Sequence, residues 1–183
     1  MEDNPRILPD HLDELPTYYW KDSSGAVGGV GFTVYGKPIP MPRPAATMTR
    51  NGLRVYSPKK TKGGAFSLEF KNLLLASTEK ELPLFKDGVT GAEVNLHVSV
   101  TYRIRRPNDH YKTSNRAGGL LKPTKVMARV TGGDIDNLLK YAQDSMNSVV
   151  YYDDKMINSL STKKLWCHYP DSDGSMTVEV KNI

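Results

Sequence analysis

The sequence has only one cysteine, Cys167, and four histidines that are scattered along 183 residues. One cysteine cannot form an internal disulfide, and the adjacent His168 lacks the paired ligand spacing of a structural zinc site, so neither is expected. No segment approaches the roughly 18 apolar residues of a membrane span, and residues 1–5 lack the basic start of a targeting signal. We therefore expect a cytoplasmic protein that has no membrane partner.

The sequence also lacks internal repeats, and its length allows one ordinary domain but not two comfortable ones. Residues 1–25 hold six acidic and two basic residues, a local charge of −4, which leaves +9 on the remainder of a chain whose net charge is +5. We interpret residues 1–25 as an acidic extension that is partly disordered or forms an extra strand, and residues 26–183 as the folded domain. The basic remainder favours a polyanionic partner such as nucleic acid.

Hydrophobic periodicity predicts a small α/β (α+β) domain in which two main helices pack on one sheet. The helices are expected at Phe66–Ser77 and at about Asp134–Asn147, and strict alternation predicts a strand within Gly91–Arg105. The other predicted strands are a hairpin of Tyr18–Trp20 with Ala26–Tyr35, a tight turn at Asn51-Gly52, and a closing hairpin of Leu160–Tyr169 with Ser175–Lys181.

Gly132–Asp154 is an acidic stretch in an otherwise basic chain, with five aspartates and one lysine. Asp136, Lys140 and Asp144 recur every four residues on the predicted helix, so an exposed row of ordinary ion pairs is one interpretation. A second interpretation is a binding site, because Asp134 as the N-cap residue can bring its carboxylate close to that of Asp136 in the first turn. The two glycines at 132 and 133 would let the backbone approach a ligand just before these carboxylates.

Asp153-Asp154 suggests a third carboxylate for the same site, because the short run Val149–Tyr152 is expected to return the chain toward the helix start. Three carboxylates without histidine or cysteine indicate magnesium, for which manganese can substitute, with water and a phosphate oxygen as further ligands. The chemistry that such a site favours is metal-assisted hydrolysis of a phosphodiester.

The order Asp134-x-Asp136-Asn137-Leu138-x-Lys140, then Asp144, then Asp153-Asp154, resembles the motif of the RusA-like Holliday junction endodeoxyribonucleases. Gly36–Pro40, Arg43-Pro44 and Tyr56–Thr61 are similar to the N-terminal part of that family, and the likeness covers about Val27–Val180. Ala45-Ala46 stand where the family often has basic residues, and the acidic extension has no counterpart in compact members.

The resemblance implies a homodimer with a mixed sheet that binds a four-way or otherwise branched DNA and resolves Holliday junctions by paired symmetric cleavage, in recombination and repair. It implies that Asp134, Asp136 and Asp154 bind magnesium and that Lys140 is an essential basic residue beside them. It further implies that Asn137, Asp144 and Asp153 support these ligands, that no organic cofactor is used, and that the cell is bacterial or phage-infected.

A branched-DNA-binding protein without catalysis is the alternative, in which cations merely neutralise phosphates. The candidate DNA-binding residues are the same in both cases. They are Arg43, Arg50, Arg54, Lys59, Lys60, Lys62, Lys112, Arg116, Lys122 and Lys125.

Overall fold

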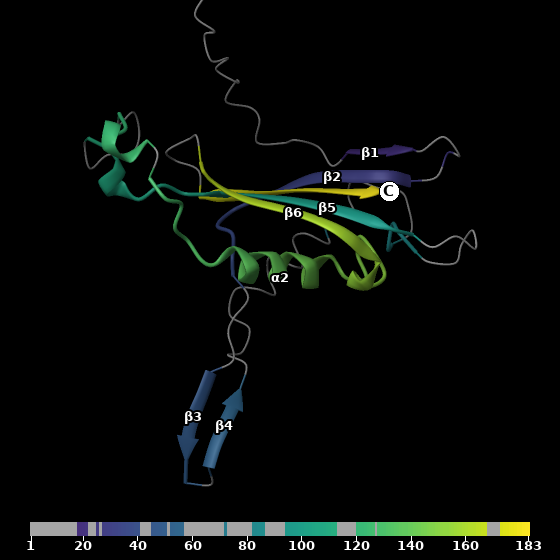
Figure 1. Ribbon diagram of the computed structural model, residues 1–183, viewed down its shortest axis with the longest axis horizontal. Coiled ribbons are helices and arrows are strands. Elements are labelled where there is room, and N and C mark those ends of the chain that lie inside the picture. The colour runs from purple at the N-terminus through teal and green to yellow at the C-terminus, as the bar shows by residue number, and fades with distance from the viewer. Residues whose placement is uncertain are drawn as a thin grey trace, which may run out of the picture.

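A mixed five-stranded sheet forms the centre of the computed structural model (Figure 1). The structure describes residues 18–21, 25, 27–40, 45–50, 52–56, 72, 82–86, 94–112, 120–126, 128–167 and 173–183. Four of the strands are long: β2 (Val27–Tyr35), β5 (Leu96–Ile104), β6 (Ile157–Trp166) and β7 (Gly174–Asn182). The fifth, β1 (Tyr18–Lys21), is a short strand at one edge.

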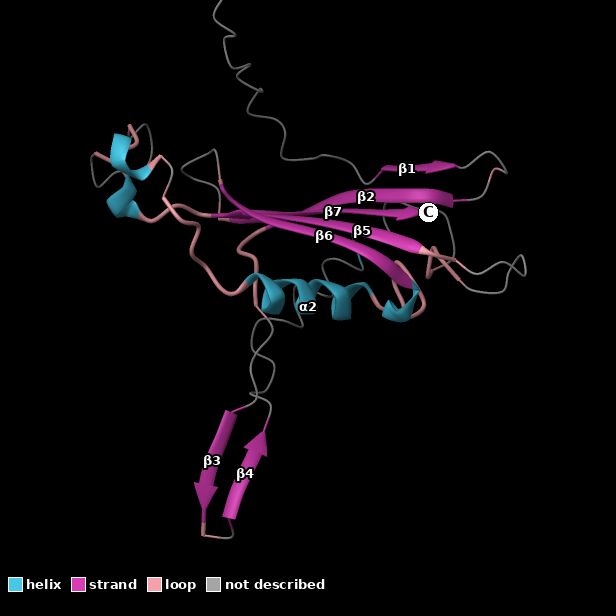
Figure 2. Ribbon diagram, in the orientation of Figure 1, coloured by secondary structure: helices cyan, strands magenta, loops and turns pink. Residues whose placement is uncertain are grey.

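The strand order is β1-β2-β7-β5-β6. Neighbouring strands run antiparallel except for β5 and β6, which are parallel. The parallel pair is joined through the one long helix that the structure describes, α2 (Ile135–Met146), which lies along one face of the sheet (Figure 2). A parallel pair needs such a crossover, because its second strand must begin at the end of the sheet where the first one began.

The core lies between the sheet and α2. Alternate residues of β5 are buried, as its strict alternation predicts, and Val98 and Val100 have no exposed surface. Leu138, Ala142 and Met146 of α2 are buried against this layer at helical spacing. Because a fully buried Val or Leu side chain contributes about 1.5–3 kcal/mol, this apolar stripe holds α2 on the sheet.

Several sequence predictions are confirmed. The predicted hairpin of residues 18–35 exists as β1 paired with β2, and the predicted helix at 134–147 is α2. On either side of the predicted Asn-Gly turn, β3 (Ala45–Thr49) pairs with β4 (Gly52–Tyr56) in a separate two-stranded hairpin, which Figure 1 shows apart from the main sheet. The predicted helix Phe66–Ser77 lies outside the described residues, apart from residue 72.

The predicted closing hairpin is wrong. Both of its strands exist, but β6 does not pair with β7, because β5 lies between them. β7 runs antiparallel to β5 along Leu96–Ile104, and β6 pairs with the opposite side of β5 in parallel register. Strand β6 is therefore an edge strand of the sheet. Separately, no described helix has the length and hydropathy needed to cross a bilayer.

Candidate active site

The N-terminal end of α2 presents two carboxylates, as the sequence predicts. Asp134 is the N-cap residue in an extended conformation (φ −76°, ψ 141°), and Asp136 lies in the first helical turn. The Asp134 backbone oxygen accepts the first helical hydrogen bond from Leu138 N at 3.1 Å, whereas the Asp134 side chain makes no capping hydrogen bond. Both residues are exposed and lie beside the positive end of the helix dipole.

Two glycines with positive φ lead into this helix start, Gly132 at 97° and Gly133 at 95°. A Cβ atom on Gly132 would lie 2.8 Å from Ile104 Cγ2, and one on Gly133 would lie 3.4 Å from Pro40 Cβ. The sequence predicted that these glycines would let a ligand approach the backbone. In the structure, the groups that lie close to them are the side chains of Ile104 and Pro40. The glycines bring the chain tightly over the end of β5, which fixes where Asp134 begins the helix.

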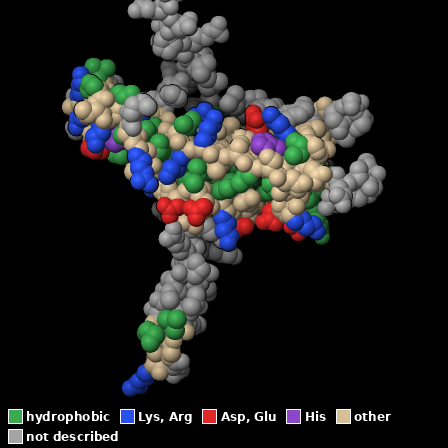
Figure 3. All heavy atoms as spheres, in the orientation of Figure 1, with side chains coloured by type: hydrophobic (Ala, Val, Ile, Leu, Met, Phe, Trp, Pro, Cys, Tyr) green, Lys and Arg blue, Asp and Glu red, His purple; other side chains and the backbone are tan. Residues whose placement is uncertain are grey.

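An open depression of about 630 Å³ lies at this place. Its lining residues come from the segment before α2, the first turn of α2, and strand β6: Arg129, Val130, Asp134, Ile135, Asp136 and Lys164. Lys164 Nζ donates a hydrogen bond to the Gly133 carbonyl oxygen at 2.7 Å. Figure 3 shows an acidic group at the N-terminal end of α2 with Lys and Arg side chains gathered above it.

Lys164 is a site residue that the sequence reasoning missed. Lys164 lies opposite Tyr102 near the carboxyl end of β6, and α2 runs back from that end of the parallel pair. In α/β folds, ligand sites form outside the carboxyl ends of parallel strands. A strand–helix–strand reading of residues 96–166 would therefore have pointed to Lys164, but the sequence predicted β6 as half of a hairpin.

Lys140 does not belong to a row of ion pairs. It is exposed on α2, and its Nζ has no carboxylate oxygen of Asp136 or Asp144 within 4.0 Å. The ion-pair interpretation of this face is therefore not realised in the structure. Lys140 places its positive charge at the surface one helical turn after Asp136.

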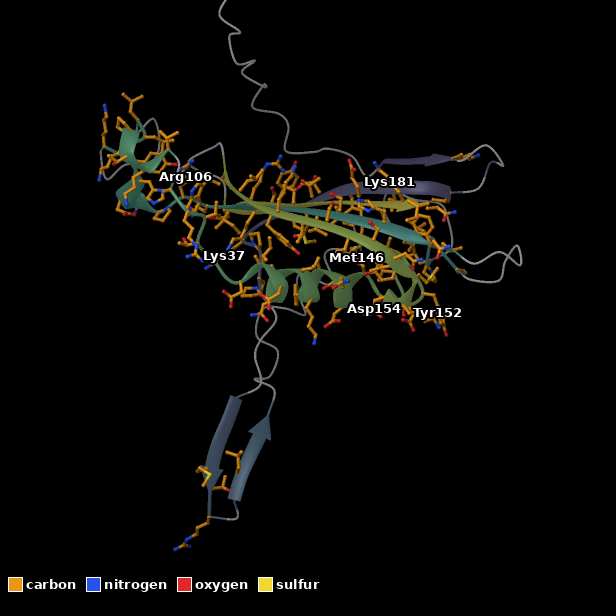
Figure 4. The ribbon with its side chains drawn as sticks, in the orientation of Figure 1. Lys37, Arg106, Met146, Tyr152, Asp154 and Lys181 are labelled. Carbon is orange, nitrogen blue, oxygen red and sulfur yellow. The ribbon has the colours of Figure 1, made fainter. Side chains whose placement is uncertain are left out.

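Asp154 does not lie beside Asp134 and Asp136 in the structure, and the predicted return of the chain toward the start of the helix is wrong. Val149 N and Val150 N both donate to the Met146 carbonyl oxygen, and Ser148 N donates to Tyr151 O at 2.8 Å, so a tight turn keeps the chain at the far end of α2. Figure 4 shows Asp154 near Met146 and Tyr152. A helix of 12 residues is about 18 Å long, so the two ends of α2 are far outside the reach of one metal ion.

Asp144 and Asp154 make the far end of α2 acidic as well. Burial raises the pKa of the Tyr151 phenol, and the negative charges of Asp154 and then Asp144 raise it further. Tyr151 is fully buried, and its hydroxyl donates to the Gln143 carbonyl oxygen at 3.2 Å. The phenol therefore stays protonated and neutral, and its role under this acidic end of α2 is structural.

Asp153 and Asn137, the other predicted supporting residues, lie at different ends of α2. The Asp153 carboxylate accepts a hydrogen bond from Lys155 N at 3.0 Å, and this bond lowers the pKa of Asp153. It thereby caps the short η3 helix (Asp154–Met156) that leads into β6. Asn137 lies half-buried in the first turn of α2, next to Asp136.

Asp134 and Asp136, which we call the acid pair, by themselves suit magnesium. Among the described residues no group of three or more His, Cys, Asp or Glu side chains is gathered in a way that could hold a metal ion. Magnesium in phosphoryl-transfer sites is commonly held by one or two carboxylates, with water and substrate phosphate oxygens as the other ligands. Asp134 and Asp136 meet that requirement, with oxygen donors only.

The candidate DNA-binding cations lie in two described places. Arg50 is exposed in the turn of the β3–β4 hairpin, and Arg54 lies in β4 with its side chain outside the described part. Lys112, Lys122 and Lys125 belong to what we call the basic lobe, residues 105–112 and 120–126, which contains η1 (Asn108–His110) and η2 (Pro123–Lys125). The other candidates, Arg43, Lys59, Lys60, Lys62 and Arg116, lie outside the described residues.

Trp166 at the end of β6 holds the basic lobe on the domain. Its ring meets His110 of the lobe edge-on with 5.1 Å between centroids, and its Nε1 donates to the carbonyl oxygen of Ala128, which follows the lobe, at 2.9 Å. The Arg106 guanidinium lies 5.3 Å from the centroid of the same ring, close enough for a cation–π interaction. The cations of the lobe are therefore carried on a packed unit rather than on a loose connection.

The chain is similar to known proteins over most of its length. The family model described as Endodeoxyribonuclease RusA matches residues 35–181. The uncharacterized protein YqaN of Bacillus subtilis (strain 168) is 27% identical over 147 residues, which are 77% of this chain and 90% of that protein. The matched region contains the acid pair, all of α2 and strand β6.

Proposed function

The chain belongs to the RusA endodeoxyribonuclease family, and from that premise we propose that it is a magnesium-dependent nuclease that resolves Holliday junctions by paired symmetric cleavage. The observation that carries this proposal is the acid pair of Asp134 and Asp136 in an open depression that also contains the cations Arg129 and Lys164. Metal-assisted phosphodiester hydrolysis requires carboxylates that hold the metal and, beside them, cations that hold the phosphate.

The residues of the site have separate roles in this proposal. Asp134 and Asp136 hold magnesium, which when bound lowers the pKa of a coordinated water and neutralises charge on the phosphate. The helix dipole adds positive potential at the same place, where the phosphate oxygens gain negative charge in the transition state. Lys140 supplies a fixed positive charge one turn further along α2, where it can position the DNA strand.

Asp154 enters the site through a homodimer. We propose that two protomers pair about a two-fold axis with their α2 helices antiparallel, which brings the far end of one helix to the start of the other. Asp154 of the partner subunit then joins Asp134 and Asp136, and Asp144 supports it. Closed two-fold symmetry generates two equal sites, which matches two symmetric cuts in a four-way junction.

A branched-DNA-binding protein without catalysis is the second candidate. The observation that favours it is the separation of Asp154 from the acid pair, because a protein that stayed monomeric would offer only two carboxylates. The basic lobe and Arg50 serve phosphate binding in either case.

A cleavage assay on a four-way junction separates the two candidates. We expect paired nicks in magnesium, binding without cutting in calcium, and no cutting in a chelator. The control is a linear duplex of the same sequence, which should be cut far less. Tight junction binding with no cleavage in magnesium or manganese would support the non-catalytic candidate.

A further inference from the structure

Lys164 is placed in the depression by two independent features. Parallel pairing puts it opposite Tyr102 of β5, on the face of β6 that also carries the buried Trp166. Its ammonium donates to the Gly133 carbonyl oxygen at 2.7 Å, and its side chain is half-buried. A lysine that is held at both its backbone and its ammonium is much more restricted than a surface lysine, and its charge has a defined position.

The Lys164 ammonium also keeps donors for a ligand. It has three N–H groups, and the hydrogen bond to Gly133 uses one of them. In the part of the chain that the structure describes, no carboxylate oxygen lies within 4.0 Å of Lys164 Nζ. Lys164 lines the same depression as Asp134, Asp136 and Arg129, so its ammonium can donate to a ligand that enters there.

Arg129 adds a second cation to the same depression, from the segment that precedes the two glycines. It is exposed, and its planar guanidinium can donate two parallel hydrogen bonds to a phosphate. A lysine point charge and an arginine fork that approach from two chain segments suit an anion with several oxygens. A phosphodiester next to metal-binding carboxylates is such an anion.

We propose that Lys164 and Arg129 form the phosphate-binding half of the site and contact the phosphodiester that is cut. This inference rests on the proposed nuclease function and names the residues that hold its substrate. Lys164 has a further effect as a positioning residue, because its bond to Gly133 ties β6 to the turn that carries Asp134.

The test is a thermodynamic cycle between the protein and the DNA. The cleavage positions are first mapped with the unaltered protein in magnesium, and a junction is then made with a neutral methylphosphonate at those positions. Binding is measured in calcium for the unaltered protein and for Lys164→Met on both junctions. If Lys164 contacts the altered phosphate, the two changes remove the same interaction and are not additive.

We expect Lys164→Met to weaken binding of the ordinary junction about tenfold, as for one charge-assisted hydrogen bond, and to cause little further loss on the methylphosphonate junction. Lys163→Met is the matched control. Successive strand residues point to opposite faces, so Lys163 lies on the other side of β6, and its loss should be equal on both junctions. Lys164→Arg should retain part of the affinity.

Equal losses for Lys164→Met on the two junctions would overturn the inference, since Lys164 would then act elsewhere on the DNA or only on the fold. Thermal unfolding shows whether Lys164→Met is folded, and Arg129→Met carries the same cycle if it is not. A protein that neither binds nor cuts junctions would instead overturn the proposed function. If the unaltered protein cleaves junctions but the effects of Lys164→Met and of the methylphosphonate on binding are additive, only the phosphate-binding assignment is lost.

Discussion

Asp136 and Asp154 lie at opposite ends of one helix, Asp136 in the first turn of α2 and Asp154 beyond its last residue, Met146. The separation decides how a three-carboxylate site can be built. In the composite site that we propose, one protomer supplies Asp134 and Asp136, and a second protomer supplies Asp154.

Mixing two inactive variants tests this composite site. Asp136→Asn and Asp154→Asn should each abolish cleavage when pure. In a mixed dimer one site receives both substitutions and the other receives neither, so we expect nicking to return after the two proteins are denatured and refolded together. If Asp154 served its own protomer, every site in the mixture would carry a defect and no nicking would appear.

The substitution Asp136→Asn should separate binding from cutting. The amide is a weaker metal ligand than the carboxylate, so cleavage in magnesium should fall by several orders of magnitude while junction binding in calcium persists. Glu179→Gln is a matched control, because Glu179 pairs with Lys181 at 3.6 Å on β7. Cleavage by Asp136→Asn at the unaltered rate would contradict the metal-ligand role.

Gly132→Ala should destabilise the fold. A methyl group there meets Ile104 Cγ2 at 2.8 Å on a backbone with φ of 97°, so we expect a loss of about 1–3 kcal/mol in the free energy of unfolding. Gly52→Ala is the control, since its φ is 104° but nothing lies within 4 Å of the added atom. Urea unfolding of the two variants should therefore show the larger loss for Gly132→Ala.

Acid should loosen the basic lobe through His110. Burial lowers the pKa of His110, the Asp109 charge opposes this, and Lys125, Arg106 and Lys122 lower it further. The unfolded chain then binds the proton more readily, so stability is lost as the pH falls below the ordinary histidine value of 6.5. The stability of His110→Gln should change less between pH 7 and 5 than that of the unaltered protein, measured by urea unfolding.

Salt dependence tests the DNA-binding cations. If Lys112 and Arg50 contact phosphates, each change to alanine should reduce the slope of log affinity against log salt by about 0.9. The measurement is junction binding in calcium over a series of salt concentrations. An unchanged slope would show that the cation is only a solvated surface charge.

The sequence predicted the local features of this fold well and the long-range ones poorly. The periodicities of β5 and α2 and the N-cap at Asp134 are confirmed because each depends on residues close together in the chain. The β6–β7 hairpin is wrong because strand order is decided by packing between distant segments, which placed β5 between the two strands.

The candidate site follows the same division. Asp134 and Asp136 are two positions apart in the chain, and both line the same depression. Asp154 was misplaced because the turn after Met146 is held by backbone hydrogen bonds that no side-chain pattern reveals. Lys164 was missed because only the parallel register of β6 brings it to Gly133.

The hydrogen bond between Gly133 and Lys164 joins residues that are 31 positions apart, so the site is complete only after β6 has entered the sheet. A ribosome-bound chain that has emerged only as far as α2 already carries the acid pair, but it lacks the lysine that holds the turn. The order of synthesis therefore places Lys164 after the acid pair and after Arg129. The proposed cutting activity would therefore appear late in folding, when the edge of the sheet has formed.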